Sequence, residues 1–213
     1  MSQNDIFSSS QLIPVEKHAV DLQESILINI IKMITNRGYL PHSNLEANIK
    51  KILKMEPEDM VYKIPIIHKE FKHYIFRIIP HNISTINKSS GISDFLHTYK
   101  KSLNMAIVDD VSKKARVDVF NRFPNSQIFV KSDLLMDLVS QNLIPTHELL
   151  NETQALNFYT DYNLKKSNML KTNYTDPVSK YYNAKPGDIF KVTRPSETAG
   201  FVNVYRLVVK KEH

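Results

Sequence analysis

The first half of the chain contains carboxylates and a lysine, the residue types found in hydrolytic metal sites. Glu58 and Asp59 are adjacent, and Glu70 lies two positions before Lys72. Two carboxylates can hold Mg²⁺, and a lysine beside them can orient the water that attacks a phosphodiester. A Glu-x-Lys triplet is expected about once by chance in a chain of this composition, and Pro57-Glu58-Asp59 has the composition of a solvated loop. A metal-dependent nuclease is therefore an alternative function rather than the first choice.

No other set of residues favours catalysis. The eight histidines contain no His-x-x-x-His pair, and the four glycines are too scattered for a phosphate-binding loop. No serine lies in a Gly-x-Ser-x-Gly elbow. The pair Asp109-Asp110 is explained by a turn at the end of a strand. We expect no catalytic residue, no metal site and no cofactor.

The composition is that of a globular protein. Of the 213 residues, 42% are hydrophobic and 23% are charged, so the chain can bury one large core or two small ones. The absence of cysteine excludes disulfide scaffolds and thiolate chemistry. The apolar segment 26–34 contains Asn29 and Lys32 and is too short to span a bilayer. We expect a soluble intracellular protein with no signal peptide and no membrane contact.

The first 145 residues predict an α/β region. Apolar residues at three- and four-residue spacing predict a helix over 16–37 that ends at Gly38. Ser43 and Glu46 have the spacing of a capping box for a second helix. Alternation over 71–79 predicts a strand with Tyr74 and Phe76 on one face. A helix over 93–103 and strands over 105–108 and 127–130 are expected to follow.

Residues 146–213 predict a separate, small α+β domain. The polar residues before Pro145 indicate a junction, because the residue before a proline avoids the helical conformation. Asn151 with Gln154 can cap a helix that runs to residue 162, and Asp176-Pro177 can open a short one. Three further features are expected: a type II turn at 185–188, and strands over 189–193 and 201–209 joined by the loop 195–200.

One series of segments near the end of the chain is more specific. In order, it reads Pro-Thr-His-Glu from 145, Asp-Pro-Val-Ser-Lys-Tyr-Tyr from 176, Lys-Pro-Gly-Asp from 185, Arg-Pro-Ser-Glu-Thr-Ala-Gly from 194 and Tyr-Arg-Leu-Val from 205. This order and spacing resemble the C-terminal assembly domain of the fifth subunit of eukaryotic RNA polymerases and its archaeal counterpart. The resemblance implies a non-catalytic subunit of a hetero-oligomeric DNA-dependent RNA polymerase that docks on the largest subunit and contacts other subunits.

The same residues have a physical interpretation. Gly200 permits a positive φ where a hairpin closes, and the side chains of Arg194, Glu197 and Arg206 can make charged hydrogen bonds that fix a partner's register. With Thr198 and Tyr205 they form the expected partner-binding set. The simpler alternative is that the loop residues serve only local turn chemistry.

The first region resembles the N-terminal jaw domain of the same family more weakly. Asn36-Arg37-Gly38-Tyr39-Leu40 matches the end of the first jaw helix. Where cellular members carry Thr-Pro-Ser-Ala near downstream DNA, this chain reads Ser112-Lys-Lys-Ala-Arg116. We predict a basic turn in which Lys113, Lys114 and Arg116 contact duplex phosphates, and the formal charge of +6 fits such contact. The resemblance also implies a nuclease-like topology without an active site.

The origin of the protein decides where such a subunit works. The abundance of Ile, Asn and Lys and the divergent jaw favour a large DNA virus. The expected location is the host cytoplasm and the virion for a viral protein, and the nucleus for a cellular one. Two alternatives remain: the nuclease of Glu58, Asp59, Glu70 and Lys72, and a free-standing transcription factor that carries the assembly module.

Overall fold

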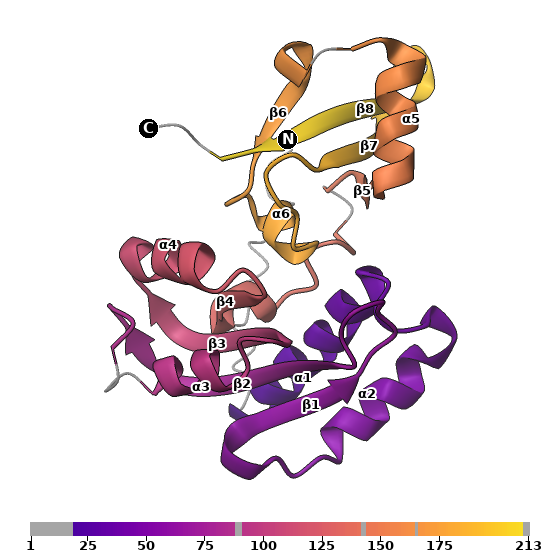
Figure 1. Ribbon diagram of the computed structural model, residues 1–213. Helices are drawn as coiled ribbons and strands as arrows, with labels where there is room; N and C mark the ends of the chain where they lie inside the picture. The colour runs from indigo at the N-terminus through magenta and orange to yellow at the C-terminus, as the bar shows by residue number, and fades with distance from the viewer. Residues whose placement is uncertain (1–18, 88–90, 142–143, 165, 211–213) are drawn as a thin grey trace, which may run out of the picture.

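The computed structural model contains two four-stranded sheets (Figure 1). It describes residues 19–87, 91–141, 144–164 and 166–210. The helices are α1 Ala19–Asn36, α2 Leu45–Leu53, α3 Ile92–Thr98, α4 Lys113–Arg122, α5 Glu152–Tyr162 and α6 Pro177–Tyr181. The strands are β1 Val61–Pro65, β2 His73–Ile83, β3 Leu103–Val111, β4 Ser126–Val130, β5 Thr146–Leu149, β6 Leu170–Asn173, β7 Ile189–Ser196 and β8 Gly200–Val209. Short 3₁₀ turns lie at His42–Asn44, Glu58–Met60, Lys131–Leu134 and Lys166–Asn168.

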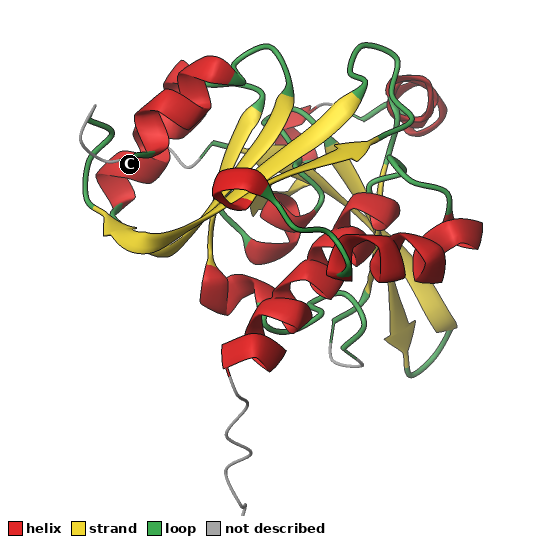
Figure 2. Ribbon diagram, turned by 90° about the horizontal axis from the view of Figure 1, so that it is seen from below, coloured by secondary structure: helices red, strands yellow, loops and turns green. Residues whose placement is uncertain are grey.

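The first sheet has the order β1-β2-β3-β4 and is covered by helices on both faces. Strand β1 is antiparallel to β2, whereas β2, β3 and β4 run parallel. Parallel neighbours need long crossovers, and α3 and α4 provide them on the face opposite α1 and α2. Figure 2 shows the helices in red on either side of the strands in yellow. The α/β character expected of this region is confirmed.

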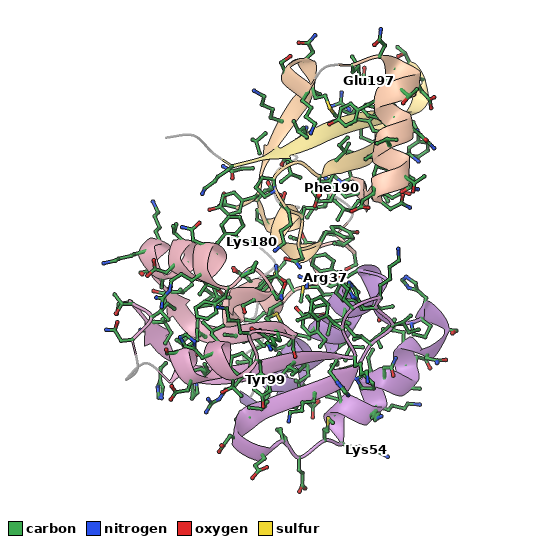
Figure 3. The ribbon with its side chains drawn as sticks, viewed as in Figure 1. Arg37, Lys54, Tyr99, Lys180, Phe190 and Glu197 are labelled. Atoms are coloured by element: carbon green, nitrogen blue, oxygen red, sulfur yellow. The ribbon has the colours of Figure 1, made fainter. Side chains whose placement is uncertain are left out.

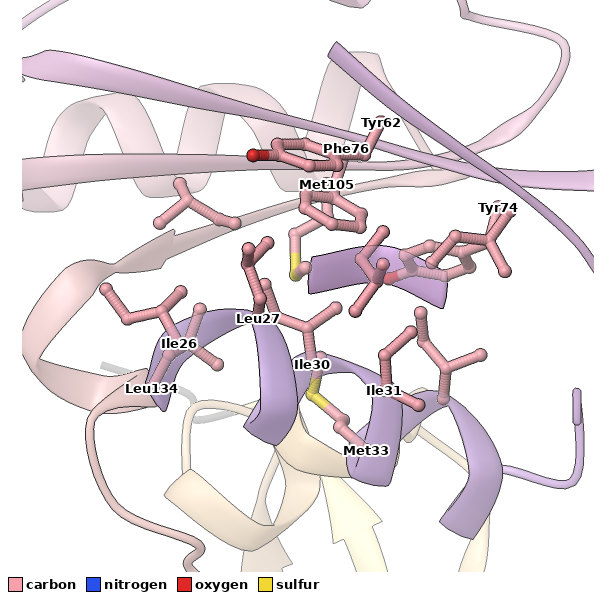
Figure 4. Close-up of a cluster of buried hydrophobic side chains, with 14 of the residues drawn as sticks. Ile26, Leu27, Ile30, Ile31, Met33, Tyr62, Tyr74, Phe76, Met105 and Leu134 are labelled. Carbon is pink, nitrogen blue, oxygen red and sulfur yellow. The ribbon is translucent and has the colours of Figure 1, made fainter. Parts of the chain in front are cut away.

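The larger core packs α1 against the sheet. Its buried side chains include Ile30 and Met33 from α1, Phe76 from β2 and Met105 from β3 (Figure 4). Tyr74, Phe76 and Ile78 lie on this face of β2, as the alternation predicted. Ile75 and Ile79 are also buried, because α3 and α4 cover the other face. The predicted strand is therefore a central strand that is buried on both sides.

The ends of α1 and α2 show what local sequence could and could not define. The Gly38 stop is confirmed: Gly38 has φ 77° and its N–H donates to Thr35 O, while Tyr39 N–H donates to Ile34 O, the pair of bonds that closes a Schellman motif. Residues 16–18 of the predicted helix lie outside the described residues. The predicted capping box of Ser43 and Glu46 is wrong. A 3₁₀ turn precedes α2, and the N-cap of α2 is Asn44, whose side chain makes no cap bond.

Two further element boundaries differ from the expectation. The helix predicted over 93–103 ends at Thr98, and residues from Leu103 onward belong to β3. The basic turn predicted at 112–116 is wrong, because Ser112 is the N-cap of α4 and its side chain accepts a hydrogen bond from Ala115 N. Ser112 is therefore a helix-start signal.

The second sheet has the order β5-β7-β8-β6. Strands β7 and β8 form a hairpin, β5 lies antiparallel to β7, and β6 lies parallel to β8. The capping box of Asn151 and Gln154 and the Asp176 N-cap are both present as predicted. The turn at 185–188 also has the predicted form, with Asp188 N bonded to Lys185 O and φ 106° at Gly187. Strands β1, β5 and β6 were not predicted.

The two sheets lie on either side of residue 145, where the sequence indicated a junction. Tyr181 from α6 nevertheless belongs to the hydrophobic cluster of the first sheet. The division into domains 1–145 and 146–213 thus stays a prediction. In the described part of the chain, no helix is long and apolar enough to cross a membrane.

Candidate functional site

The β7–β8 hairpin carries the charged residues singled out as a partner-binding set. Ser196 pairs with Gly200, so the connection is a three-residue turn, shorter than the loop predicted over 195–200. Gly200 has φ 70°, which fits its expected role at the closing turn. Arg194, Glu197 and Thr198 lie at this exposed end, whereas Arg206 pairs with Phe190 at the other end of the strands. Figure 3 shows Glu197 at the end of the second sheet that is far from the first sheet.

The three charged side chains of this hairpin are exposed. Among the described residues, the side chains of Arg194, Glu197 and Arg206 make no hydrogen bond or ion pair. The Thr198 hydroxyl lies 3.5 Å from Ser196 Oγ. Charged side chains that already lie in solvent and have no internal partner are available for charge-assisted bonds to another molecule.

Tyr205 is placed differently from the other members of the set. Its ring packs against Phe158 of α5 at a tilt, with ring centres 4.3 Å apart, and lies near Tyr162. Burial raises the pKa of the Tyr205 hydroxyl above its usual value. The ring therefore packs α5 onto the hairpin, and it does not lie beside Arg194 and Glu197.

The three cations expected to meet DNA lie in the first turn and a half of α4. Lys113 and Lys114 are exposed. Arg116 is half-buried and lies on the side of α4 that faces α6. Burial lowers the pKa of Lys180 in α6, and the charge of Arg116 lowers it further. The structure thus brings Lys113 and Lys114 together at an exposed helix start, whereas Arg116 faces Lys180 of α6.

A set of polar contacts, here called the polar seam, joins the first region (residues up to 145) to the second region (residues 146–213). Sequence reasoning missed this seam. The guanidinium of Arg37, at the end of α1, donates to Tyr181 O at 2.6 Å, to Lys180 O at 3.0 Å and to the Tyr74 hydroxyl at 2.9 Å. Figure 3 shows Arg37 and Lys180 between the two sheets. The last carbonyls of a helix have no partner inside the helix, and a cation near them also favours the helix dipole. Arg37 therefore caps α6 from the other region.

Further hydrogen bonds between the two regions complete the seam. Asn36 Nδ2 donates to the Tyr181 hydroxyl at 2.9 Å, and Gln127 Nε2 donates to Lys180 O at 3.1 Å. Lys185 Nζ donates to Pro124 O at 3.1 Å. Burial raises the pKa of Tyr181 to about 12. It also lowers the pKa of Lys185, to which the Arg37 charge adds.

In the sequence, the run Asn36-Arg37-Gly38 is the feature that could have indicated this seam, because it places an arginine just before a helix-ending glycine. Its partners, Lys180 and Tyr181, lie 143 and 144 positions away. Nothing local to either segment indicates such a pairing.

The residues of the alternative nuclease do not form a metal site in this fold. Glu58, Asp59, Glu70 and Lys72 are all exposed. Within the described residues, no group of three or more acidic or histidine side chains could hold a metal ion. His68 has a structural role there, since its Nδ1 accepts from the backbone N–H groups of Glu70 and Phe71.

Comparison with known proteins identifies the family. The chain is 30% identical over 206 residues to DNA-directed RNA polymerase subunit 5 of Acanthamoeba polyphaga mimivirus, a match that covers 94% of this chain and 98% of that protein. The chain belongs to the subunit 5 family of DNA-directed RNA polymerases. Residues 136–208 also match the family described as RNA polymerase Rpb5, C-terminal domain. The function is accordingly that of a non-catalytic polymerase subunit, and neither the nuclease nor the free-standing factor is supported.

Other members of the subunit 5 family match between a third and two fifths of this chain. The Dictyostelium discoideum protein named DNA-directed RNA polymerases I, II, and III subunit rpabc1 is 38% identical over 81 residues, or 38% of this chain and 41% of that protein. Subunit Rpo5 of Methanosphaera stadtmanae is 43% identical over 72 residues, which is 34% of this chain but 94% of that protein. The short relative therefore corresponds almost entirely to one part of this chain.

Proposed function

We propose that the chain docks on the largest subunit of a multi-subunit RNA polymerase through residues 146–213. The observation that carries this proposal is the match of residues 136–208 to the family described as RNA polymerase Rpb5, C-terminal domain. Subunit Rpo5 of Methanosphaera stadtmanae adds support, because the 72 residues that match this chain make up 94% of that polymerase subunit. The β7–β8 hairpin is the proposed docking surface, because Arg194, Glu197 and Arg206 are exposed there and have no partner among the described residues.

The wider assembly follows from the same proposal. The chain is one member of a hetero-oligomer that includes the other polymerase subunits. It works where its polymerase works: the host cytoplasm and the virion for a viral enzyme, as the similarity to the mimivirus protein favours, and the nucleus for a cellular one.

We also propose that the start of α4 flanks the duplex that enters the polymerase. Lys113 and Lys114 are exposed at a helix N-terminus, where the backbone N–H groups add positive potential. Cations in this position favour phosphate contacts, which are insensitive to sequence and sensitive to salt. Arg116 contributes from the side of the helix that faces Lys180.

Replacing Arg194 and Glu197 together with alanine tests the docking surface. If these side chains are desolvated in the assembled enzyme, binding to the largest subunit weakens by about 2–4 kcal/mol. Pull-down of the largest subunit at graded concentrations of the chain measures this change. The matched control replaces Glu152 and Lys171, an exposed acid and an exposed base of the same region, and should bind like the parent. Equal binding by all three proteins would exclude Arg194 and Glu197 from the docking surface.

A further inference from the structure

The hairpin β7–β8 extends beyond the strands that flank it. Strand β5 pairs with β7 from Phe190 to Thr193, and β6 pairs with β8 from Arg206 to Val209. In the described part of the chain, residues 200–205 of β8 have no strand on their outer side. We call this stretch of backbone the free edge.

The hydrogen bonds at the base of the hairpin define which residues point to the free edge. Val208 N–H donates to Asp188 O at 2.8 Å, toward β7, whereas Val209 O accepts from Tyr174 N on the β6 side. Backbone groups alternate along a strand of an antiparallel pair. Phe201, Asn203 and Tyr205 therefore direct their backbone groups outward. Phe201 N–H donates to Ala199 O at 2.8 Å. Asn203 and Tyr205 precede Arg206, the first residue of β8 that pairs with β6, so in the described part of the chain no strand pairs with their outward N–H groups.

The opposite edge of the hairpin is blocked. Ile189 O accepts from Leu150 N on the β5 side, so the odd-numbered residues of β7 point outward. Beyond the last pair with β5, at Thr193, the next outward residue is Pro195. A proline has no N–H to offer, and prolines are a common protection of edge strands. The two edges thus differ: β7 cannot accept a further strand at its end, and β8 can.

The side chains beside the free edge indicate what would bind there. Phe201 is 74% exposed and Val202 is 36% exposed, so the edge offers apolar contact. Val202 and Arg206 lie on one face of β8, and Arg194, directly opposite Val202, lies on the same face. Both arginines are exposed and have no partner among the described residues. A strand beside this edge would meet two unpaired positive charges on one face.

We propose that the free edge of β8 pairs with an extended, acidic segment of another polymerase subunit, which is added to the sheet as a fifth strand. The Asn203 and Tyr205 N–H groups donate to that segment, and its carboxylates face Arg206 and Arg194. Main-chain bonds provide the affinity in strand addition, and the side chains provide the specificity. A second copy of this chain is a poor occupant, because it would bring the same arginines to the same edge. The inference rests on the proposed docking through residues 146–213 and specifies its geometry.

The variant Asn203→Pro removes one outward donor and leaves the pairing with β7 intact, because Asn203 makes no backbone bond to that strand. It also loses the side-chain bond between Thr193 and Asn203. Asn203→Ala is the matched control, since it loses the same side-chain bond and keeps the N–H. We expect Asn203→Pro to bind the polymerase about tenfold more weakly than Asn203→Ala. Equal binding by these two folded variants would overturn the strand addition and leave docking itself in place.

Hydrogen exchange of the unaltered chain provides a test that does not depend on a variant. The Asn203 and Tyr205 amides should exchange rapidly in the free chain and slowly in the assembled polymerase, while the Val202 and Val204 amides are slow in both. Unchanged exchange at Asn203 and Tyr205 in the assembled polymerase would overturn the inference. So would a dimer of the free chain that Asn203→Pro dissociates. A chain that does not bind the polymerase at all would overturn the docking proposal together with it.

Discussion

Arg37 is the residue on which the contact between the two regions most depends. Replacing it with methionine keeps much of its length but removes three donors, so the Tyr181 carbonyl loses its partner. We expect a loss of about 2–4 kcal/mol in the free energy of unfolding, measured with urea. Arg37→Lys should restore only part of it, because an ammonium cannot reproduce the fork of the guanidinium.

The control for this prediction is Arg206→Met, at an exposed arginine with no partner among the described residues. Its free energy of unfolding should stay within about 0.5 kcal/mol of the parent. If Arg37→Met were as stable as Arg206→Met, the seam would not hold the two regions together.

Tyr181 predicts a specific dependence of stability on pH. Its pKa is raised by burial from 10.0 to about 12, so the folded state favours the neutral phenol. This contribution is fully present below pH 10 and is lost as the pH rises from 10 to 12. A shift of this size corresponds to about 2–3 kcal/mol. Over this interval the parent should lose that much more stability than Tyr181→Phe, which has no phenol to ionise. Parallel pH profiles would contradict the assignment.

At the scale of elements, α4 combines a helix start with two cations that oppose its dipole. Lys113→Gln with Lys114→Gln removes those charges at little cost in helix propensity. We expect the free energy of unfolding to rise by about 0.3–1 kcal/mol per residue. In the assembled enzyme, the same double variant should make elongation complexes dissociate at lower salt.

Two controls separate these effects. Arg122→Gln, at the other end of α4, removes a favourable cation and should lower stability. Lys50→Gln with Lys51→Gln, on exposed positions of α2, should leave the salt resistance unchanged. Identical salt resistance in the parent and the α4 variant would mean that Lys113 and Lys114 contact only solvent and no DNA.

Elements with local signals were predictable, and those that depend on partners were not. Gly38, Asn151 and Asp176 marked helix ends correctly because a cap is made within a few residues. Strands β5 and β6 have four residues each and carry little pattern of their own; they exist because β7 and β8 offer edges. The charge of Lys113, Lys114 and Arg116 favours a turn at the start of α4, whereas Ser112 is the N-cap signal that the structure follows.

For the molecule as a whole, the second region should fold without the first. A fragment that begins at Thr146 contains all strands of the second sheet and both of its helices, and the Rpo5 relative has little beyond the matching part. It should unfold cooperatively but be less stable than the full chain, because Tyr181 loses its cluster and Arg37 is absent. Circular dichroism during urea unfolding measures this. An unfolded fragment would contradict the division at residue 145.

The sequence predicted the family and the order of the main elements, whereas the arrangement of the two regions required the structure. The hairpin residues and their spacing carried the resemblance. The seam could not be predicted, because Arg37 meets Lys180 and Tyr181 only after both regions have folded. The placement of Arg206 away from Glu197 likewise depends on the hairpin register.

Purification of the polymerase through an affinity tag on this chain tests its role as a polymerase subunit. We expect the two largest polymerase subunits to co-purify with the tagged chain in equal stoichiometry, together with RNA synthesis activity that resists moderate salt. We also expect the chain separated from them to have no nuclease activity with Mg²⁺. A tagged chain that elutes alone, with the polymerase complete and active in other fractions, would contradict its role as a subunit.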